Sequence, residues 1–445
     1  MSLYPIDKLL SPSDSPRNVA RAAWHALFWL VFANAVGVLI AVLLLFPGLN
    51  RLLGEWTYGR WMMVHMNLQL FGWASLPLAA FLFKVYGADR GPLAKWCRPV
   101  LWVWSTALAV GALSWLTGHS TGKLFLDWSG YARILFPLAL FALWLLLAAG
   151  LARSWNDPVN LRPVVRIAKS ILLPILLTVP FLIYAAAGPD TYPPVDPSTG
   201  GPTGASQLES SLAVVVILLM LPFGLTRRKA GPSGIVSLCW VALIAESALC
   251  AALGRGDVSH HLPAQFLSLA SLLAWIPLMP LYFGAFQWHP GTRLWRIAFL
   301  WWWGALIVTG WVFFLPGVLD HFKFTDGLVG HSFVAMAGFT SSLSVFVMVQ
   351  LMGEDGWVFN RRRSFLLWHG SVIAYVMLMT IAGWREGSDP AFTIVPSPER
   401  NLLYGLRLLV GILMLLASLD WLVDSSSLLN ESIPGAIPAL KERTA

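Results

Sequence analysis

The chain has 445 residues, of which 57% are hydrophobic and only 12% are charged. This composition excludes a soluble globular domain and is typical of a polytopic membrane protein embedded in a lipid bilayer. The formal net charge of +8 does not predict nucleic-acid binding, because the basic residues are distributed over short loops and form no single patch.

Twelve apolar segments follow one another along the chain, separated by Pro, Gly or charged residues. Each has the length of a membrane-crossing helix, roughly 17 to 25 residues. The expected segments are Ala23–Phe46, Trp61–Leu82, Val100–Leu116, Leu135–Leu151, Ile171–Ala187, Gln207–Leu225, Ile235–Ala252, Phe266–Phe286, Ile297–Phe314, Leu328–Leu351, Phe365–Ala382 and Leu402–Val423. The sequence therefore predicts an all-α fold: one twelve-helix transmembrane domain over residues 23–423, with an N-terminal segment 1–22 and a C-terminal tail 424–445. The longest polar connection, 188–205, is expected to be a loop.

Lys and Arg predict the orientation. They are concentrated in the loops on the side of the N-terminus, as in Arg227–Lys229 and Arg361–Arg363. Basic loops remain cytoplasmic, so we expect a multi-pass protein of a bacterial-type inner membrane with both termini in the cytoplasm. The N-terminus lacks the pattern of a cleavable signal peptide, because its first apolar run is too long.

With this topology, histidines gather toward the outer face. They are His65, His119, His260, His261, His321 and His331. A histidine alone in hydrocarbon is costly, and neutral imidazole is a common ligand of haem iron and copper. The cluster predicts a haem or metal site, with a proton relay and structural hydrogen bonding as alternatives. His25, His289 and His369 fall toward the inner face, and we expect no cofactor role for them.

Three motifs resemble those of one family. They are VHMN at 64–67, HHLPAQFLSLASLLAWIPLMP at 260–280, and KFTDGLVGHSF at 323–333. With the twelve segments, they resemble subunit I of the haem–copper oxidases, and most closely the C-type (cbb-type) catalytic subunit. The order and number of the apolar segments resemble the family over nearly the whole chain. The sequence motifs resemble it only at these three places.

The resemblance implies roles for four histidines. His65 would be a ligand of a low-spin haem, and His331 would be the proximal ligand of a high-spin haem. His260 and His261 would be two of three copper ligands. The implied partners are other membrane subunits and a cytochrome c-type electron donor, with b-type haem as the expected cofactor.

The chain departs from the family pattern in three ways. Phe333 stands where the family has a second histidine two residues after the first. The sixth segment, in GGPTGASQLESSLAVVV, has no histidine to complete a copper site, and no tyrosine occurs between Tyr192 and Tyr282. Two imidazoles alone bind copper poorly. We therefore expect a haem-binding protein of respiratory electron transfer that does not carry out full O2 reduction.

Other arrangements and functions remain open. One haem could lie between His65 and His331, or His331 could hold a five-coordinate haem, or Met336 could ligate opposite His65.

Glu209 and Glu246 are candidates for a nitric-oxide-reductase-like site, although a glutamate at a segment end is also typical of a helix cap. A non-enzymatic haem-binding or scaffold protein and a transporter are the remaining alternatives. No symmetry between the two halves supports a transporter.

Overall fold

The computed structural model describes residues 15–157, 163–192, 195–197, 200–231, 234–254 and 256–430. Within these ranges every regular element is helical, and only isolated β-bridges occur. Twelve helices or composite helices are long and apolar enough to cross a membrane. The prediction of an all-α chain with twelve candidate membrane spans is confirmed for the described residues.

The longer helices follow the predicted segments. They are α1 (Ser15–Leu45), α2 (Tyr58–Asn67), α3 (Ser75–Tyr86), α4 (Ala94–Leu116), α5 (Ala132–Arg153), α6 (Pro163–Ala186), α7 (Gly204–Leu225), α8 (Gly234–Leu253), α9 (Pro263–Leu269), α10 (Trp275–Gly284), α11 (Arg293–Phe313), α12 (Val318–Phe322), α13 (Asp326–Phe333), α14 (Ser341–Met352), α15 (Arg362–Ser388) and α16 (Pro398–Asn430). The 3-10 segments are η2 (Pro47–Arg51), η4 (Gly91–Leu93), η5 (Ala270–Ala274), η6 (Pro290–Thr292), η8 (Gly353–Phe359) and η9 (Pro390–Thr393), and the π-helical ones are η3 (Leu68–Ala74) and η7 (Val334–Thr340).

Two spans contain a π-helical segment that begins three residues after a histidine. His65 lies three residues before η3, which joins α2 to α3, and His331 lies three residues before η7, which joins α13 to α14. The two composite spans are connected by a hydrogen bond of 2.8 Å from Trp73 Nε1 to Ser341 Oγ. Short π-helical segments inside α-helices are frequent at functional sites, because they redirect the side chains around them.

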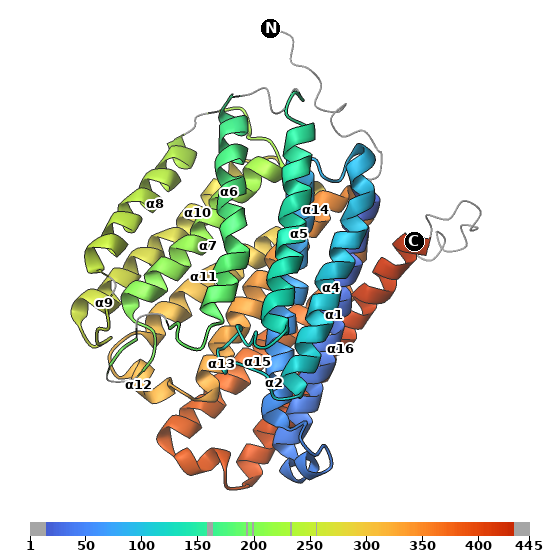
Figure 1. Ribbon diagram of the computed structural model, residues 1–445. Helices are drawn as coiled ribbons and strands as arrows, with labels where there is room; N and C mark the ends of the chain where they lie inside the picture. The colour runs from blue at the N-terminus through green and yellow to red at the C-terminus, as the bar shows by residue number, and fades with distance from the viewer. Residues whose placement is uncertain are drawn as a thin grey trace.

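The first and last spans pack side by side along their length. Trp24 near the start of α1 donates to Ser426 near the end of α16 (3.1 Å). Further along the pair, Asn34 on α1 donates to Ser418 on α16 (3.1 Å). The two helices are therefore antiparallel, with the start of α1 and the end of α16 at the same end of the bundle (Figure 1).

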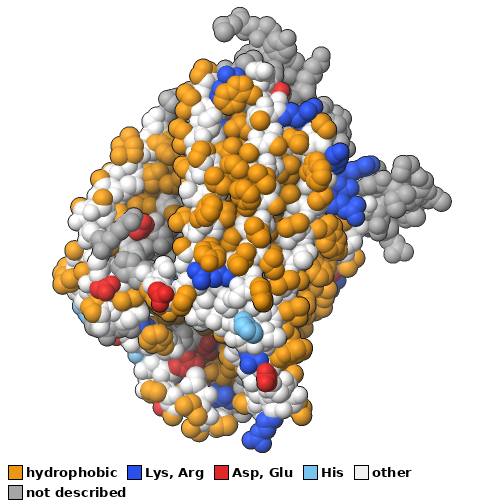
Figure 2. Space-filling model, in the orientation of Figure 1, with side chains coloured by type: hydrophobic (Ala, Val, Ile, Leu, Met, Phe, Trp, Pro, Cys, Tyr) orange, Lys and Arg blue, Asp and Glu red, His pale blue; other side chains and the backbone are white. Residues whose placement is uncertain are grey.

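The outside of the bundle is apolar over most of the visible face. Orange side chains cover the helices in Figure 2, while Lys and Arg gather near the upper end. Exposed Leu, Ile, Phe and Trp side chains occur on most of the long helices. This is the surface expected of a protein solvated by lipid.

The ends of the predicted domain differ slightly from the structure. Helix α1 already begins at Ser15 and α16 continues to Asn430, so residues 15–22 and 424–430 of the predicted terminal segments are helical. The polar end of α16 is held by partners, because Asp424 forms an ion pair of 2.7 Å with Arg361. Residues 1–14 and 431–445, and residues 193–194 and 198–199 of the predicted loop 188–205, lie outside the described residues.

Candidate functional site

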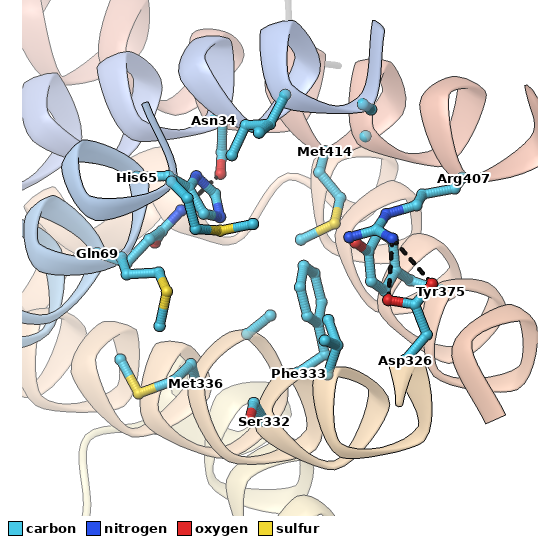
Figure 3. Close-up of a pocket in the computed structure, with 18 of the residues that line it drawn as sticks. Asn34, His65, Gln69, Asp326, Ser332, Phe333, Met336, Tyr375, Arg407 and Met414 are labelled. Atoms are coloured by element: carbon cyan, nitrogen blue, oxygen red, sulfur yellow. Dashed lines mark hydrogen bonds and ion pairs between the residues drawn. The ribbon is translucent and has the colours of Figure 1, made fainter. Parts of the chain in front are cut away.

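A cavity of ≈ 380 Å³ lies among α1, α2, the α13–η7 segment, α15 and α16. Its volume falls in the range of small-molecule and cofactor pockets, about 300–1,000 Å³. The walls are mostly apolar, and the polar groups are concentrated in a few places (Figure 3). The residues labelled in Figure 3 are Asn34, His65, Gln69, Asp326, Ser332, Phe333, Met336, Tyr375, Arg407 and Met414.

His65 on α2 contributes the imidazole of this cavity. Its Nδ1 lies 2.7 Å from the carbonyl oxygen of Ala33 on α1. A carbonyl only accepts, so Nδ1 carries the proton and Nε2 keeps its lone pair. Histidines that ligate metals commonly donate their other ring nitrogen to a backbone carbonyl in this way. The geometry of His65 is therefore compatible with an iron ligand.

Gly37 on α1 makes room for the His65 ring. A Cβ atom at this position would lie 2.9 Å from Cε1 and 3.2 Å from Nδ1 of His65. Contacts this short do not occur between real carbon atoms, so a larger residue would displace the ring. The position of His65 thus depends on a glycine in the first span.

The opposite wall is formed by α13 and η7. Ser332, Phe333 and Met336 extend into the cavity from this side, facing the helix that carries His65 (Figure 3). The Phe333 ring stacks on Tyr375 with centroids 3.8 Å apart and an interplanar angle of 14°. Phe333 cannot ligate iron, whereas the thioether of Met336 can, as in His/Met cytochromes.

One end of the cavity is charged. Arg407 Nη1 lies 3.2 Å from both carboxylate oxygens of Asp326. The backbone N–H of Asp326 donates to Glu386 (2.6 Å), and the Tyr404 hydroxyl also donates to Glu386 (3.4 Å). Charges within a membrane span require such partners. Because the guanidinium is already paired with a carboxylate and Glu386 lies beside it, this end of the cavity is polar without a free positive charge.

His331 belongs to a different environment. Its Nδ1 lies 3.0 Å from Thr309 Oγ1 on α11, and the Thr309 hydroxyl donates to the Ala305 carbonyl (2.7 Å). The hydroxyl therefore accepts from Nδ1–H, and Nε2 of His331 keeps its lone pair. His331 is not among the residues that line the His65 cavity, and Gly310 on α11 lies close to its ring. The structure thus does not bring His65 and His331 to one cavity.

The adjacent pair His260 and His261 precedes α9 and forms a cluster with Asp320 on α12. The Asp320 Oδ1 atom lies 3.3 Å from His260 Nε2 and 3.5 Å from His261 Nε2. Three such ligand atoms within 4.8 Å of one another can surround a metal ion. Ligands about 2.0–2.1 Å from a tetrahedral zinc ion lie roughly 3.3 Å apart, which matches these separations.

A second carboxylate orients the buried member of the pair. The side chain of His260 is fully buried, and its Nδ1 and backbone N–H lie 2.5 and 2.6 Å from Asp196 Oδ2. Its Nε2, facing Asp320, makes no hydrogen bond of good geometry with any described residue. A carboxylate behind a histidine is typical of metal centres, because it fixes the ring and its tautomer. His331 is not part of this group.

The predicted acidic residues lie elsewhere. Glu209 on α7 is exposed, and Glu246 on α8 is buried and accepts a hydrogen bond of 2.5 Å from Trp275 Nε1. Neither glutamate belongs to a metal-binding group among the described residues. Of the other outer histidines, His321 donates to the Trp384 carbonyl (3.1 Å) and His119 is exposed in a loop beside Thr117 (3.2 Å).

Asn67 in the first motif has a structural role. It is buried, and its amide donates to Asp127 Oδ2 (2.8 Å) in the connection between α4 and α5. Trp115 Nε1 donates to the Asp127 backbone carbonyl (2.8 Å). Burial raises the pKa of Asp127, and the Asn67 hydrogen bond only partly opposes this effect. The motif therefore places His65 at the cavity and secures an adjacent loop.

Sequence reasoning missed three residues of these sites. Asp196 and Asp320 complete the histidine cluster, but each lies in a polar connection where an acidic residue gives no signal by itself. Arg407 did give a signal, because it is the only Lys or Arg inside a predicted apolar segment. A cation at that depth predicts a buried acidic partner, and Asp326 in KFTDGLVGHSF is that partner.

Comparison with known proteins identifies no relative: no protein-family model matches the chain, and no curated protein matches it.

Proposed function

We propose that the chain is a haem-binding membrane redox protein that resembles subunit I of the haem–copper oxidases and acts in respiratory electron transfer without full O2 reduction. The observation that carries the proposal is His65, whose Nδ1 is held by Ala33 while its Nε2 remains available at a cavity of ≈ 380 Å³. The twelve spans and the three sequence motifs are compatible with it.

The residues around the cavity fit one haem with a single histidine ligand. Gly37 leaves room for the His65 ring, Met336 offers a thioether from the facing wall, and the Arg407–Asp326 pair makes one end of the cavity polar. Haem supplies one-electron redox chemistry, whose potential depends on the axial ligands. His331 does not line this cavity, whereas Met336 does. Of these two residues, Met336 is therefore the better candidate for a second iron ligand opposite His65.

The chain itself would tune that chemistry. His65 would hold the iron from α2, with its ring orientation set by Ala33. Apolar walls would limit water access and thus influence the potential. The electron donor would be a cytochrome c-type protein at the outer face, within a complex of membrane subunits. Both termini would lie in the cytoplasm of a bacterial-type inner membrane.

The remaining histidines extend the proposal. His331, whose Nε2 has no hydrogen-bond partner among the described residues, would be the ligand of a second haem near α11. His260 and His261 are the proposed ligands of a metal ion together with Asp320. Imidazole and carboxylate suit Zn²⁺ or Fe²⁺, whereas a three-imidazole copper site is not supported by the described residues.

Optical difference spectra of the purified protein test the proposal. We expect a reduced-minus-oxidised haem signal that His65→Ala abolishes or converts, while His119→Ala leaves it unchanged, because His119 is exposed in a loop. Met336→Leu should change the low-spin spectrum if its thioether is a ligand, and Met414→Leu on another wall is the matched control. A purified protein without haem, expressed with haem supply, would refute the proposal.

One observation favours a second function, a haem-binding or scaffold protein without redox turnover. The Phe333–Tyr375 stack occupies the wall where the resembled family has a second histidine. Rapid reduction of the bound haem by a cytochrome c-type donor would exclude this alternative. A haem that binds stoichiometrically but accepts no electrons would favour it.

A further inference from the structure

Two residues that line the His65 cavity belong to a loop and not to a span. Leu124 and Phe125 lie in the connection between α4 and α5, which covers residues 117–131. The Leu124 side chain is 67% exposed although it lines the cavity, and Tyr58 of α2, which lines the same cavity, is half-buried. A loop side chain that faces both a cavity and solvent lies at the mouth of that cavity. The His65 cavity therefore opens under this loop.

Leu124 and Phe125 are the two central residues of a tight turn. The backbone N–H of Leu126 donates to the Lys123 carbonyl (2.8 Å) and closes the turn. Phe125 has a φ of 61°, a left-handed conformation that turns usually assign to glycine. Its Cβ makes that conformation unfavourable, and such strain persists only where surrounding contacts hold it, commonly at ligand clamps and switch regions. The turn therefore favours another conformation once those contacts are released.

Both ends of the connection are fixed to the bundle. Arg60 Nη1 on α2 donates to the Leu116 carbonyl at the end of α4 (2.9 Å), and Trp128 is fully buried before α5 begins. Between these two points, Gly118 and Gly122 have φ values of 88° and 70°. Glycine populates positive and negative φ about equally, so the backbone can rotate at these positions with little steric cost. A movement of the turn can therefore be confined to the residues between the two fixed ends.

Lys123, the first residue of the turn, fastens it to the end of α6. Its Nζ donates to the carbonyl oxygens of Ala186 (2.9 Å), Thr191 (2.5 Å) and Gly188. The ammonium also lies 4.7 Å from the centroid of the Tyr192 ring. Carbonyls at a helix C-terminus carry partial negative charge and attract a cation, and three of them match the three N–H donors of an ammonium group. One side chain thus holds the turn against another helix.

We propose that the turn Lys123–Leu126 is a gate through which an apolar ligand enters and leaves the His65 cavity from the aqueous face. The structure shows the gate closed, with its two central side chains at the mouth and Lys123 as the latch. When Lys123 leaves the α6 carbonyls, the turn swings about the preceding glycines and the backbone of Phe125 relaxes. The ligand then reaches the cavity without passing between the spans. The gate belongs to the same cavity as the function proposed above and rests on that function only for the identity of the ligand.

Thiol accessibility of the full chain in detergent tests the gate. Ser332→Cys places a thiol in the cavity by exchanging a single atom, and its rate of reaction with a cationic, water-soluble methanethiosulfonate is measured. The native cysteines, which are buried or half-buried, give the background rate in the parent. We expect slow modification with Ser332→Cys alone and at least about tenfold faster modification when Lys123→Met is added, because hydrogen bonds to a charged group are lost. Lys123→Arg keeps a cationic donor and should restore the slow rate.

Two controls separate release of the gate from general loosening. Arg133 Nε donates to the Tyr184 carbonyl at the same end of α6 (3.0 Å) but lies outside the turn, so Arg133→Gln should leave the rate unchanged. Ser342→Cys places a thiol on α14, where the parent side chain is fully buried, and it should stay unreactive in the Lys123→Met background.

An unchanged rate for Ser332→Cys in the Lys123→Met background would overturn the gate. Equal acceleration by Arg133→Gln, or of Ser342→Cys, would also overturn it, because the whole helix end would then be loose. The readout is one thiol and requires no haem. A chain without haem would therefore refute the function proposed above and leave this result intact.

Discussion

The ring of Phe333 lies almost parallel to the ring of Tyr375, with centroids 3.8 Å apart, and together they form one wall of the His65 cavity. The residue that departs from the resembled motif is thus packed against an aromatic partner on α15. An aromatic pair of this kind is worth about 0.5–1.5 kcal/mol beyond the area it buries. A second imidazole at this position would need to replace that packing.

Phe333→His is expected to add an axial ligand across the cavity from His65. If haem binds there, the spectrum of the variant should shift toward that of a bis-histidine low-spin haem, because imidazole is a strong iron ligand. Phe333→Leu, which also removes the stack on Tyr375, should cause no such shift. An identical spectrum for the histidine variant and the parent, with haem retained in both, would contradict the placement of haem between these walls.

Gly37→Ala should displace the His65 ring. The new methyl group would lie 2.9 Å from Cε1 of His65, so the imidazole would move away from Ala33 and from its position at the cavity. We expect reduced haem retention, measured as the ratio of haem absorbance to protein during purification. Gly59→Ala, on the helix that carries His65, meets no atom within 4 Å and should retain haem normally. Equal retention in both variants would remove His65 from the cofactor site.

Asp127→Asn should alter the pH dependence of stability. Burial raises the pKa of Asp127 in the folded chain, so the folded state binds this proton more tightly than the unfolded state does. The contribution of Asp127 is therefore most favourable below the ordinary aspartate pKa of about 3.9 and declines as the pH rises through the folded value. Asn is neutral at every pH. The melting temperature of the variant should therefore fall less than that of the parent as the pH increases from 4 toward neutral. A parallel pH profile for both proteins would refute this role.

The apolar segments predicted the spans because hydrocarbon imposes a simple rule on the sequence. Every residue that faces lipid must be apolar, and each span must close its own backbone hydrogen bonds. The prediction differed from the structure only at the helix ends. The polar residues Ser425 and Ser426 suggested that the last helix ends before them. In the structure α16 continues past them, and the Trp24–Ser426 and Arg361–Asp424 contacts hold this part of the helix. Such contacts join residues about 400 or 60 positions apart and leave no local signal.

The residues of the candidate sites could be selected from the sequence only in part, because partners far apart in the chain leave no local signal. His65, His260 and His261 could be selected because an imidazole at membrane depth needs a partner. The sequence could not reveal that His260 would be paired with Asp196 and Asp320, since these come from two different connections. Nor could it separate His65 from His331, because the direction of each ring depends on the π-helical turns and on Ala33 and Thr309.

Asp320→Asn should weaken metal binding at the histidine cluster. The carboxylate lies 3.3 and 3.5 Å from the Nε2 atoms of His260 and His261, and an amide is a much poorer ligand for a divalent ion. Zn²⁺ titration of chelator-treated protein should give one site in the parent and a large loss of affinity in this variant. Asp196→Asn should cost about 10–100-fold, since it removes the partner that orients His260. Asp355→Asn, an exposed residue of η8 at the other end of the span that follows Asp320, is the control. Unchanged zinc affinity in the Asp320 variant would refute the three-ligand site.

Breaking the ion pair at the polar end of the cavity should destabilise the protein strongly. Arg407→Met leaves the Asp326 carboxylate, which is 14% exposed, without its cation; truncating one partner of a fully buried pair costs about 3–5 kcal/mol, so we expect a loss that approaches this range. Arg407→Met combined with Asp326→Leu removes both charges and should recover much of this loss. Arg385→Gln, which removes a half-exposed pair with Glu399, should cost less than about 1 kcal/mol. Thermal unfolding in detergent measures the stability of all these variants. If the double variant loses as much stability as the sum of the losses from Arg407→Met and Asp326→Leu alone, the two residues do not stabilise the fold as a pair.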